Sequence, residues 1–197
     1  MVYVVIAYVV FAASAWLLSD RMIFVPHPTE YADRPETIKL ETADGVIISA
    51  EYMQSNESEY TFLYSHGNGE DLGDLMPFLA EYADNGFSVF TYDYHGYGTS
   101  GGRASESAAY MDIEAAWEYM REELEIPAEN IIILGRSVVT GPSLWLAERK
   151  DAAGVLLISP FISAFRVVTH YPLLPFDKFN NLKRIRHINM PVMIVHG

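Results

Sequence analysis

The sequence indicates its fold most clearly in Asn130-Ile131-Ile132-Ile133-Leu134-Gly135-Arg136-Ser137-Val138-Val139-Thr140-Gly141. Four consecutive apolar residues predict a buried strand, and the pattern that follows, over residues 138–150, predicts a helix. A strand that turns sharply into a helix would present the hydroxyl of Ser137 at the tip of the turn, where it could act as a nucleophile. The alternative is that Ser137 only caps the helix, a role that serine fills well.

Strands and helices alternate on both sides of this stretch. The predicted strands are 36–41, 46–53, 60–64, 87–92, 130–134, 154–158 and 191–195, and the predicted helices are 70–84, 105–125 and 138–150. The first two strands form a hairpin around Asp44-Gly45. The later alternation is typical of an α/β domain, with a mostly parallel sheet and helices on both of its faces.

The N-terminal residues differ in composition from the rest. Residues 2–18 contain no charged side chain and are followed at once by Ser19, Asp20 and Arg21. A run of this length is just long enough to cross a bilayer, so we expect a single-pass transmembrane anchor over residues 1–21. A cleaved signal peptide and a buried N-terminal helix are the alternatives. The side of the membrane stays open, because one basic residue does not set an orientation.

The remaining chain predicts one domain. Residues 22–33 contain two prolines and form an extended connector, and residues 34–197 form the domain. Within it, residues 159–190 are irregular and rich in Phe, Leu, Tyr and Pro. Six apolar side chains of this segment either pack in the core or line a binding pocket: Phe161, Phe165, Tyr171, Leu173, Leu174 and Phe176.

Charge and residue type exclude several kinds of partner. The chain has 13 basic and 26 acidic residues, a formal charge of -13, and no basic stripe, so we expect no nucleic acid partner. It has no cysteine, which excludes disulfides and thiolate metal sites. His27, His170 and His187 lack the spacing of a zinc-binding helix. We therefore expect neither a metal nor a cofactor, and the sequence does not indicate an oligomeric state.

Three glycine-containing loops follow predicted strands. They are Ser65-His66-Gly67-Asn68-Gly69, Asp93-Tyr94-His95-Gly96-Tyr97-Gly98-Thr99-Ser100 and Gly135-Arg136-Ser137. Ligands of open parallel sheets bind at the carboxyl ends of the strands, so these loops are the place to expect chemistry.

Taken together, the three loops resemble those of the α/β-hydrolase superfamily, in particular its membrane-anchored serine hydrolases of the serine aminopeptidase-like or lysophospholipase-like kind. The resemblance covers about residues 34–197 and implies that residues 159–190 form a cap over the site, whose six apolar side chains named above are candidates for an acyl pocket. It implies that Ser137 attacks an ester, thioester or amide of an apolar acyl group to form an acyl-enzyme. It also implies that the backbone N–H groups of Asn68 and Val138 form the oxyanion hole.

Other loop residues would support the site. Gly135 fills the first glycine position of the G-x-S-x-G elbow, and Gly67 lies in the loop that carries Asn68. His66 precedes the nucleophile, contrary to the family order of Ser, acid and His, so we expect it to brace the oxyanion loop. Asp93 could be the triad acid, but the resemblance favours a role in holding its own turn. His95 and His196 are interpreted as loop residues at strand ends.

Two features count against activity. Val139 occupies the second glycine position of the elbow, where a stiff side chain either opens the turn or needs room made by its neighbours. The resemblance also implies a triad acid and histidine beyond residue 197, so we expect an α/β-hydrolase that lacks its last strand or strands and has little activity in this form. The alternatives are a non-catalytic α/β-hydrolase-fold binding or scaffold protein at the membrane, and a tethered structural protein.

Overall fold

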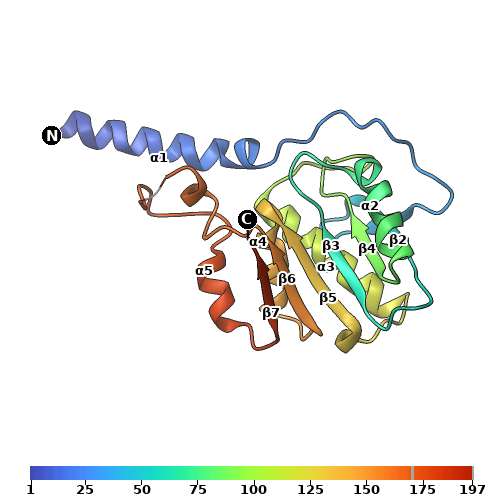
Figure 1. Ribbon diagram of the computed structural model, residues 1–197. Helices are drawn as coiled ribbons and strands as arrows, with labels where there is room; N and C mark the ends of the chain where they lie inside the picture. The colour runs from blue at the N-terminus through green and yellow to red at the C-terminus, as the bar shows by residue number, and fades with distance from the viewer. Residues whose placement is uncertain (170, 197) are drawn as a thin grey trace.

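A seven-stranded sheet forms the centre of the computed structural model, which describes residues 1–169 and 171–196 (Figure 1). The strands are β1 (Ile38–Glu41), β2 (Ile47–Met53), β3 (Thr61–Ser65), β4 (Ser88–Tyr92), β5 (Ile131–Arg136), β6 (Gly154–Ile158) and β7 (Val192–Val195). Their order is β1-β2-β4-β3-β5-β6-β7. The pairs β1–β2 and β2–β4 are antiparallel and the others are parallel, which confirms the predicted hairpin and the mostly parallel sheet.

Helices cover both faces of this sheet. The helices are α1 (Val2–Ile23), α2 (Leu72–Asp84), α3 (Glu106–Glu122), α4 (Thr140–Ala147) and α5 (Asn181–Arg184). Every residue of β3 is buried, because Leu63 packs into the core beneath α3 and α4 while Phe62 and Tyr64 pack on the opposite side with α2. Alternate residues of a strand point to opposite faces, so a strand buried on both faces is apolar throughout.

Helix ends differ from the sequence prediction where side chains cap them. The α2 helix begins at Leu72 rather than at residue 70, because the Asp71 carboxylate accepts hydrogen bonds from the N–H groups of Gly73 and Asp74. Ser105 is likewise the N-cap of α3 and lies outside it. The predicted helix 138–150 begins as a 3-10 turn, Ser137–Val139, before α4.

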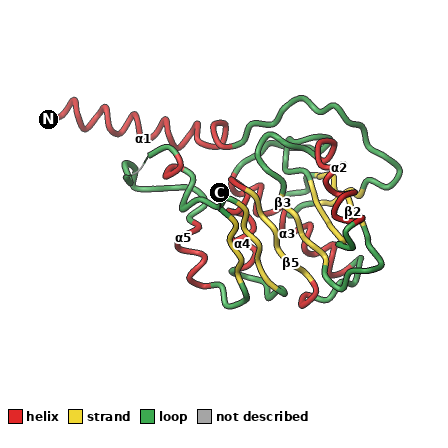
Figure 2. Tube along the Cα trace, in the orientation of Figure 1, coloured by secondary structure: helices red, strands yellow, loops and turns green. Residues whose placement is uncertain are grey.

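The α1 helix projects from one edge of the domain (Figure 1). Its 22 residues, with a mean hydropathy of 2.1 over the best window, are long and apolar enough to cross a membrane, and 6% of that window is buried. The helix ends at Ile23, two residues beyond the predicted anchor. After it, residues 24–33 run as an extended loop that arcs around the side of the domain where α2 lies (Figure 2).

The cap segment, residues 159–190, lies beside α1. It contains the short turns Phe165–Val167 and Ile185–His187 together with α5, and is otherwise irregular. The Tyr8 hydroxyl of α1 donates a hydrogen bond of 3.0 Å to the carbonyl of Leu173. Trp16 meets Phe176 edge to face, with ring centroids 5.1 Å apart. His170 lies outside the described residues.

Candidate active site

Ser137 lies at the tip of β5 in a strained turn. Its φ is +60°, in the left-handed region that non-glycine residues seldom adopt, and its side chain is exposed. Such a conformation costs about 1–3 kcal/mol and persists only where the surrounding structure imposes it. The turn therefore holds an exposed hydroxyl in one place.

Two neighbours explain why the turn is tight. A Cβ added at Gly135 would lie 2.9 Å from the Cβ of Ser143 and 3.1 Å from the Cα of Thr140, so β5 and α4 approach closely only because residue 135 has no side chain. The Thr140 hydroxyl donates a hydrogen bond of 2.8 Å to the carbonyl of Ser137.

Val139 is accommodated without opening the turn. Its side chain is 1% exposed and belongs to the core beneath α3 and α4, and its φ of -85° suits any residue. Neighbouring side chains therefore make room for the valine, and its effect on the reactivity of Ser137 stays a prediction.

Asn68 carries the predicted partner donor and is held by the start of the connector. Its side-chain Oδ1 accepts hydrogen bonds from the N–H of Val25 at 3.1 Å and from the Tyr97 hydroxyl at 2.6 Å, and its Nδ2 donates to the carbonyl of Ile23 at 2.7 Å. Among the described residues, no group accepts a hydrogen bond from the backbone N–H of Asn68 or of Val138. Both N–H groups are thus uncommitted, as donors to an oxyanion must be.

Glu70 joins the oxyanion loop to the elbow. Its Oε2 accepts a hydrogen bond of 2.8 Å from the N–H of Gly67, and its Oε1 accepts one of 2.9 Å from the guanidinium of Arg136. A Cβ at Gly67 would lie 2.7 Å from Oε2, so glycine permits this close approach. One carboxylate therefore ties together the loop before Asn68 and the residue before Ser137. The same carboxylate, as the first cause, raises the pKa of Arg136.

His66 and Asp93 are buried together behind this loop. The Asp93 carboxylate accepts a hydrogen bond of 2.9 Å from the N–H of Leu72 and another from the Tyr31 hydroxyl, and its Oδ1 lies 3.4 Å from His66 Nε2. His66 Nδ1 is 3.0 Å from the carbonyl of Gly67. This geometry agrees with loop-supporting roles for both residues, and neither side chain is exposed to a substrate.

An apolar pocket of about 560 Å³ lies beside the two predicted donors. Asn68 and Val138 line it, together with one face of α1 and cap residues that include Phe165, Leu173, Leu174 and Phe176. Phe161 and Tyr171, the other two candidates, do not line it. Ser137 is not among the residues that line this pocket, although its neighbour Val138 is.

Two other histidines, His95 and His187, are engaged elsewhere. His95 Nδ1 bonds the buried carboxylate of Asp112, which raises the pKa of His95. His187 bonds Glu148 at 2.9 Å. Neither contact involves Ser137.

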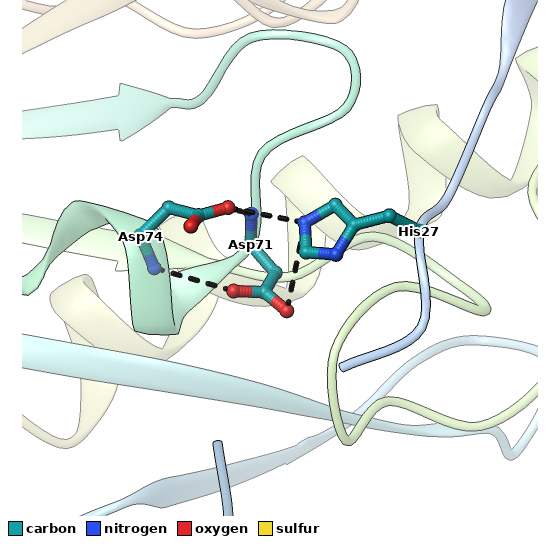
Figure 3. A group of neighbouring side chains, drawn as sticks. All are labelled: His27, Asp71 and Asp74. Carbon is teal, nitrogen blue, oxygen red and sulfur yellow. Dashed lines mark hydrogen bonds and ion pairs between the residues drawn. The ribbon is translucent and has the colours of Figure 1, made fainter. Parts of the chain in front are cut away.

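One group of described side chains has the make-up of a metal site. His27, Asp71 and Asp74 offer ligand-type atoms within 4.8 Å of one another, and Figure 3 shows the three side chains converging. His27 Nε2 is 3.0 Å from Asp74 and 3.9 Å from Asp71. Since Asp71 and Asp74 already form the capping box of α2, the group is explained as a clamp between connector and α2. The hydrogen bond of His27 Nδ1 to the Pro28 carbonyl, followed by Asp74 and Asp71, raises the pKa of His27.

Comparison with known protein families agrees with this arrangement of loops. The model of a family described as "Serine aminopeptidase, S33" matches residues 56–182, which contain both the Asn68 loop and the Ser137 elbow. The chain belongs to this family of hydrolases.

Its curated relatives are α/β-hydrolase domain proteins. Human α/β-hydrolase domain-containing protein 17B is 40% identical over 171 residues, which is 84% of this chain and 59% of that protein. Protein 17C of Xenopus laevis is 38% identical over 171 residues, 84% of this chain and 54% of that protein. The chain thus spans a little over half the length of these relatives.

Solved structures confirm the α/β-hydrolase fold. The Pyrococcus furiosus esterase Pf2001 superposes with a TM-score of 0.66 at 18% identity, covering 87% of this chain and 75% of that one. An α-β hydrolase from Vibrio vulnificus gives a TM-score of 0.67 at 21% identity, covering 81% and 63%.

Sequence reasoning missed the residues that hold the site together. Tyr31 and Glu70 contact it through hydrogen bonds, and Ala15 and Leu18 of α1 line the pocket. Glu70 stands three residues after Gly67, a spacing at which a carboxylate can accept a backbone hydrogen bond within one turn, and this signal could have found it. No such signal marked Ala15 and Leu18, because every face of an all-apolar helix has the same kind of side chains.

Proposed function

We propose that the protein is a membrane-associated serine hydrolase that cleaves an ester, thioester or amide of an apolar acyl group. The observation that carries the proposal is the strained, exposed Ser137, whose neighbour Val138 lines one apolar pocket together with Asn68. Nucleophile, oxyanion donors and acyl site are three of the parts that acyl transfer uses, beside the base that activates the serine.

The reaction would proceed through a covalent intermediate. Ser137 Oγ attacks the carbonyl carbon, and the carbonyl oxygen becomes an oxyanion that the N–H groups of Asn68 and Val138 stabilise. The bond to the leaving alcohol, thiol or amine then breaks, and the leaving group departs with the proton that the serine gave up. Water hydrolyses the acyl-serine, which releases the carboxylic acid and restores Ser137.

The proposed substrate class follows from the residues that line the pocket. Its walls are almost entirely apolar, and its volume of about 560 Å³ falls in the range of small-molecule sites. An apolar acyl group matches such walls, while its polar carbonyl would lie at the Asn68 and Val138 end.

Among the described side chains whose contacts are given above, we assign none as triad base or acid. His66, His95, His27 and His187 have partners away from Ser137, and Asp93 is buried behind the loop. The proposal is therefore that this 197-residue form reacts slowly. Sites that lack triad members keep about 10³–10⁴-fold catalysis over water from the oxyanion hole and substrate binding.

We further propose that α1 attaches the domain to a membrane. Its apolar surface is almost wholly exposed apart from the cap contact, and a helix of about 33 Å matches the thickness of a hydrocarbon core.

The experiment is a single-turnover reaction with a p-nitrophenyl ester of a long-chain acid, followed by peptide mass mapping. The proposal expects the acyl mass on the peptide that contains Ser137, and its loss in Ser137→Ala. Ser107→Ala is the matched control, since Ser107 is exposed at the start of α3. Acylation elsewhere, or equal acylation in Ser137→Ala, would leave the non-catalytic binding protein as the better account.

A further inference from the structure

The pocket beside the oxyanion donors is built in part by α1. Seven α1 residues line it: Phe11, Ser14, Ala15, Leu18, Ser19, Met22 and Ile23. They recur at three- and four-residue intervals, so they form one face of the helix. Between Phe11 and Ile23 the helix rises about 18 Å. The pocket therefore follows the helix for several turns.

The opposite wall comes from the cap segment and is also apolar. Phe165, Val168, Leu173, Leu174 and Phe176 face the helix across the pocket. The charged lining residues are Arg166 and Asp177, and the Asp177 carboxylate is occupied by the Ser163 hydroxyl at 2.6 Å and the N–H of Phe165 at 2.9 Å.

The two walls are fastened to each other at several points. Besides the bond from Tyr8 to Leu173 and the contact of Trp16 with Phe176, the ammonium group of Lys178 lies 2.5 Å from the Asp20 carboxylate. Phe24, which follows the helix, is buried against Phe179. The helix is thus docked on the domain and is not a free tether.

The mouth of the pocket borders lipid if α1 is in a membrane. The helix surface away from the cap is exposed and apolar, and Val167 and Val168 of the cap, which line the pocket, are exposed as well. Unpaired backbone groups are costly next to lipid. Here the Leu173 carbonyl is satisfied by Tyr8, and the N–H groups of residues 166–169 bond within the cap.

We infer that α1 is a substrate-binding element, and that the hydrocarbon chain of a membrane-resident acyl substrate enters the pocket sideways, from the lipid, between α1 and the cap. The inference rests on the proposed function for the identity of the reacting group. The hydrocarbon chain of the substrate can bind in the pocket without any reaction at Ser137. A hydrocarbon chain that moves from the bilayer into an apolar pocket stays out of water throughout, so its entry carries no cost of exposing apolar surface. Because the pocket follows α1 for several turns, we expect the bound hydrocarbon chain to be long.

The test uses the 197-residue chain in phospholipid nanodiscs and a long-chain fatty acid methyl ester with a photoactivatable diazirine near its chain end. Crosslinks to α1 and to residues 164–176 in the unchanged protein are expected. Ala15→Trp should fill the groove and weaken probe binding roughly tenfold, by removing the contacts of about two methylene groups. Ala13→Trp is the matched control: it makes the same change on the same helix, away from the pocket lining.

Three outcomes decide the question. Equal binding by the Ala15→Trp and Ala13→Trp variants would overturn the inference, and so would crosslinks in the unchanged protein that avoid both walls. The crosslink map does not depend on how the variants fold. Ser137→Ala should bind the probe like the unchanged chain. If that variant binds while the unchanged protein never forms an acyl-serine, the proposed hydrolysis fails and the chain-binding pocket remains.

Discussion

The side-chain nitrogen of Asn68 donates a hydrogen bond of 2.7 Å to the carbonyl of Ile23, the last residue of α1. The residue proposed to stabilise the oxyanion through its backbone therefore holds the end of the apolar helix through its side chain. The position of α1 and the geometry of the loop that carries Asn68 therefore depend on each other through this hydrogen bond.

Asn68→Ala should loosen the connector while the sheet stays intact. It removes three side-chain hydrogen bonds, two of them to the backbone at Ile23 and Val25, and partly exposed bonds contribute about 0.5–1.5 kcal/mol each. We expect a loss of about 1–3 kcal/mol in the stability of the docked connector, seen as faster hydrogen exchange over residues 24–27. Asn85→Ala, which removes a bond at the far end of α2, should leave that exchange unchanged. Equal exchange in both variants would contradict the link.

Gly135→Ala should destabilise the elbow. The new methyl group would lie 2.9 Å from Ser143 Cβ, so α4 must shift, and overpacking of this kind costs about 1–3 kcal/mol. Gly101→Ala is the control, because its Cβ meets atoms at 3.4 Å and 3.5 Å, which is ordinary contact. The measurement is the free energy of unfolding in urea. Equal losses for the two variants would mean that the turn at Gly135 is not tight.

Val139→Gly is expected to lower the stability of the fold and to raise the reactivity of Ser137. Removal of a buried valine side chain and the added freedom of glycine should cost about 2–4 kcal/mol. We expect the glycine variant to form the acyl-serine faster in the single-turnover reaction, because a residue without a Cβ lets the turn adjust around Ser137. Val139→Ala separates the effects, since it loses packing but keeps a Cβ. An unchanged acylation rate in the glycine variant would show that the valine does not hinder Ser137.

Local patterns predicted the strands because their apolar runs are continuous. β3, β4 and β6 lie within one residue of the predicted limits, and Asp44-Gly45 marked the hairpin. The elements around Ser137 and Asn68 were predicted for the same reason, since glycine turns after buried strands are local features. The contacts of Asn68 with Ile23 and of Tyr31 with Asp93 were not, because they join residues far apart in the chain. The docking of α1 on the cap could not be predicted from the sequence either, because the residues of an all-apolar helix do not show which face packs against the domain.

Docking of the connector should weaken as pH rises. The folded-state pKa of His27 is raised, first by its hydrogen bond to the Pro28 carbonyl and then by Asp74 and Asp71. The stability that this clamp contributes is therefore fully present below the unfolded pKa of about 6.5 and is lost as pH rises through the folded value. Protease cleavage within residues 24–33 should be slower at about pH 5.5 than at about pH 8.5.

His27→Gln is the control for this pH effect. It removes the titrating group, so the difference between the two pH values in cleavage of residues 24–33 should largely disappear. An unchanged difference in this variant would assign the effect to another group.

The most direct test of the account is site-resolved labelling with a long-chain alkyl fluorophosphonate. Attack by a hydroxyl on phosphorus, with loss of fluoride, needs the exposed nucleophile and the adjacent N–H donors but no second half-reaction. We expect slow labelling that maps to Ser137, is absent in Ser137→Ala and is unaffected by Ser107→Ala. Label spread over several serines, or an equal amount on Ser137→Ala, would show that this hydroxyl is not a nucleophile in the folded protein.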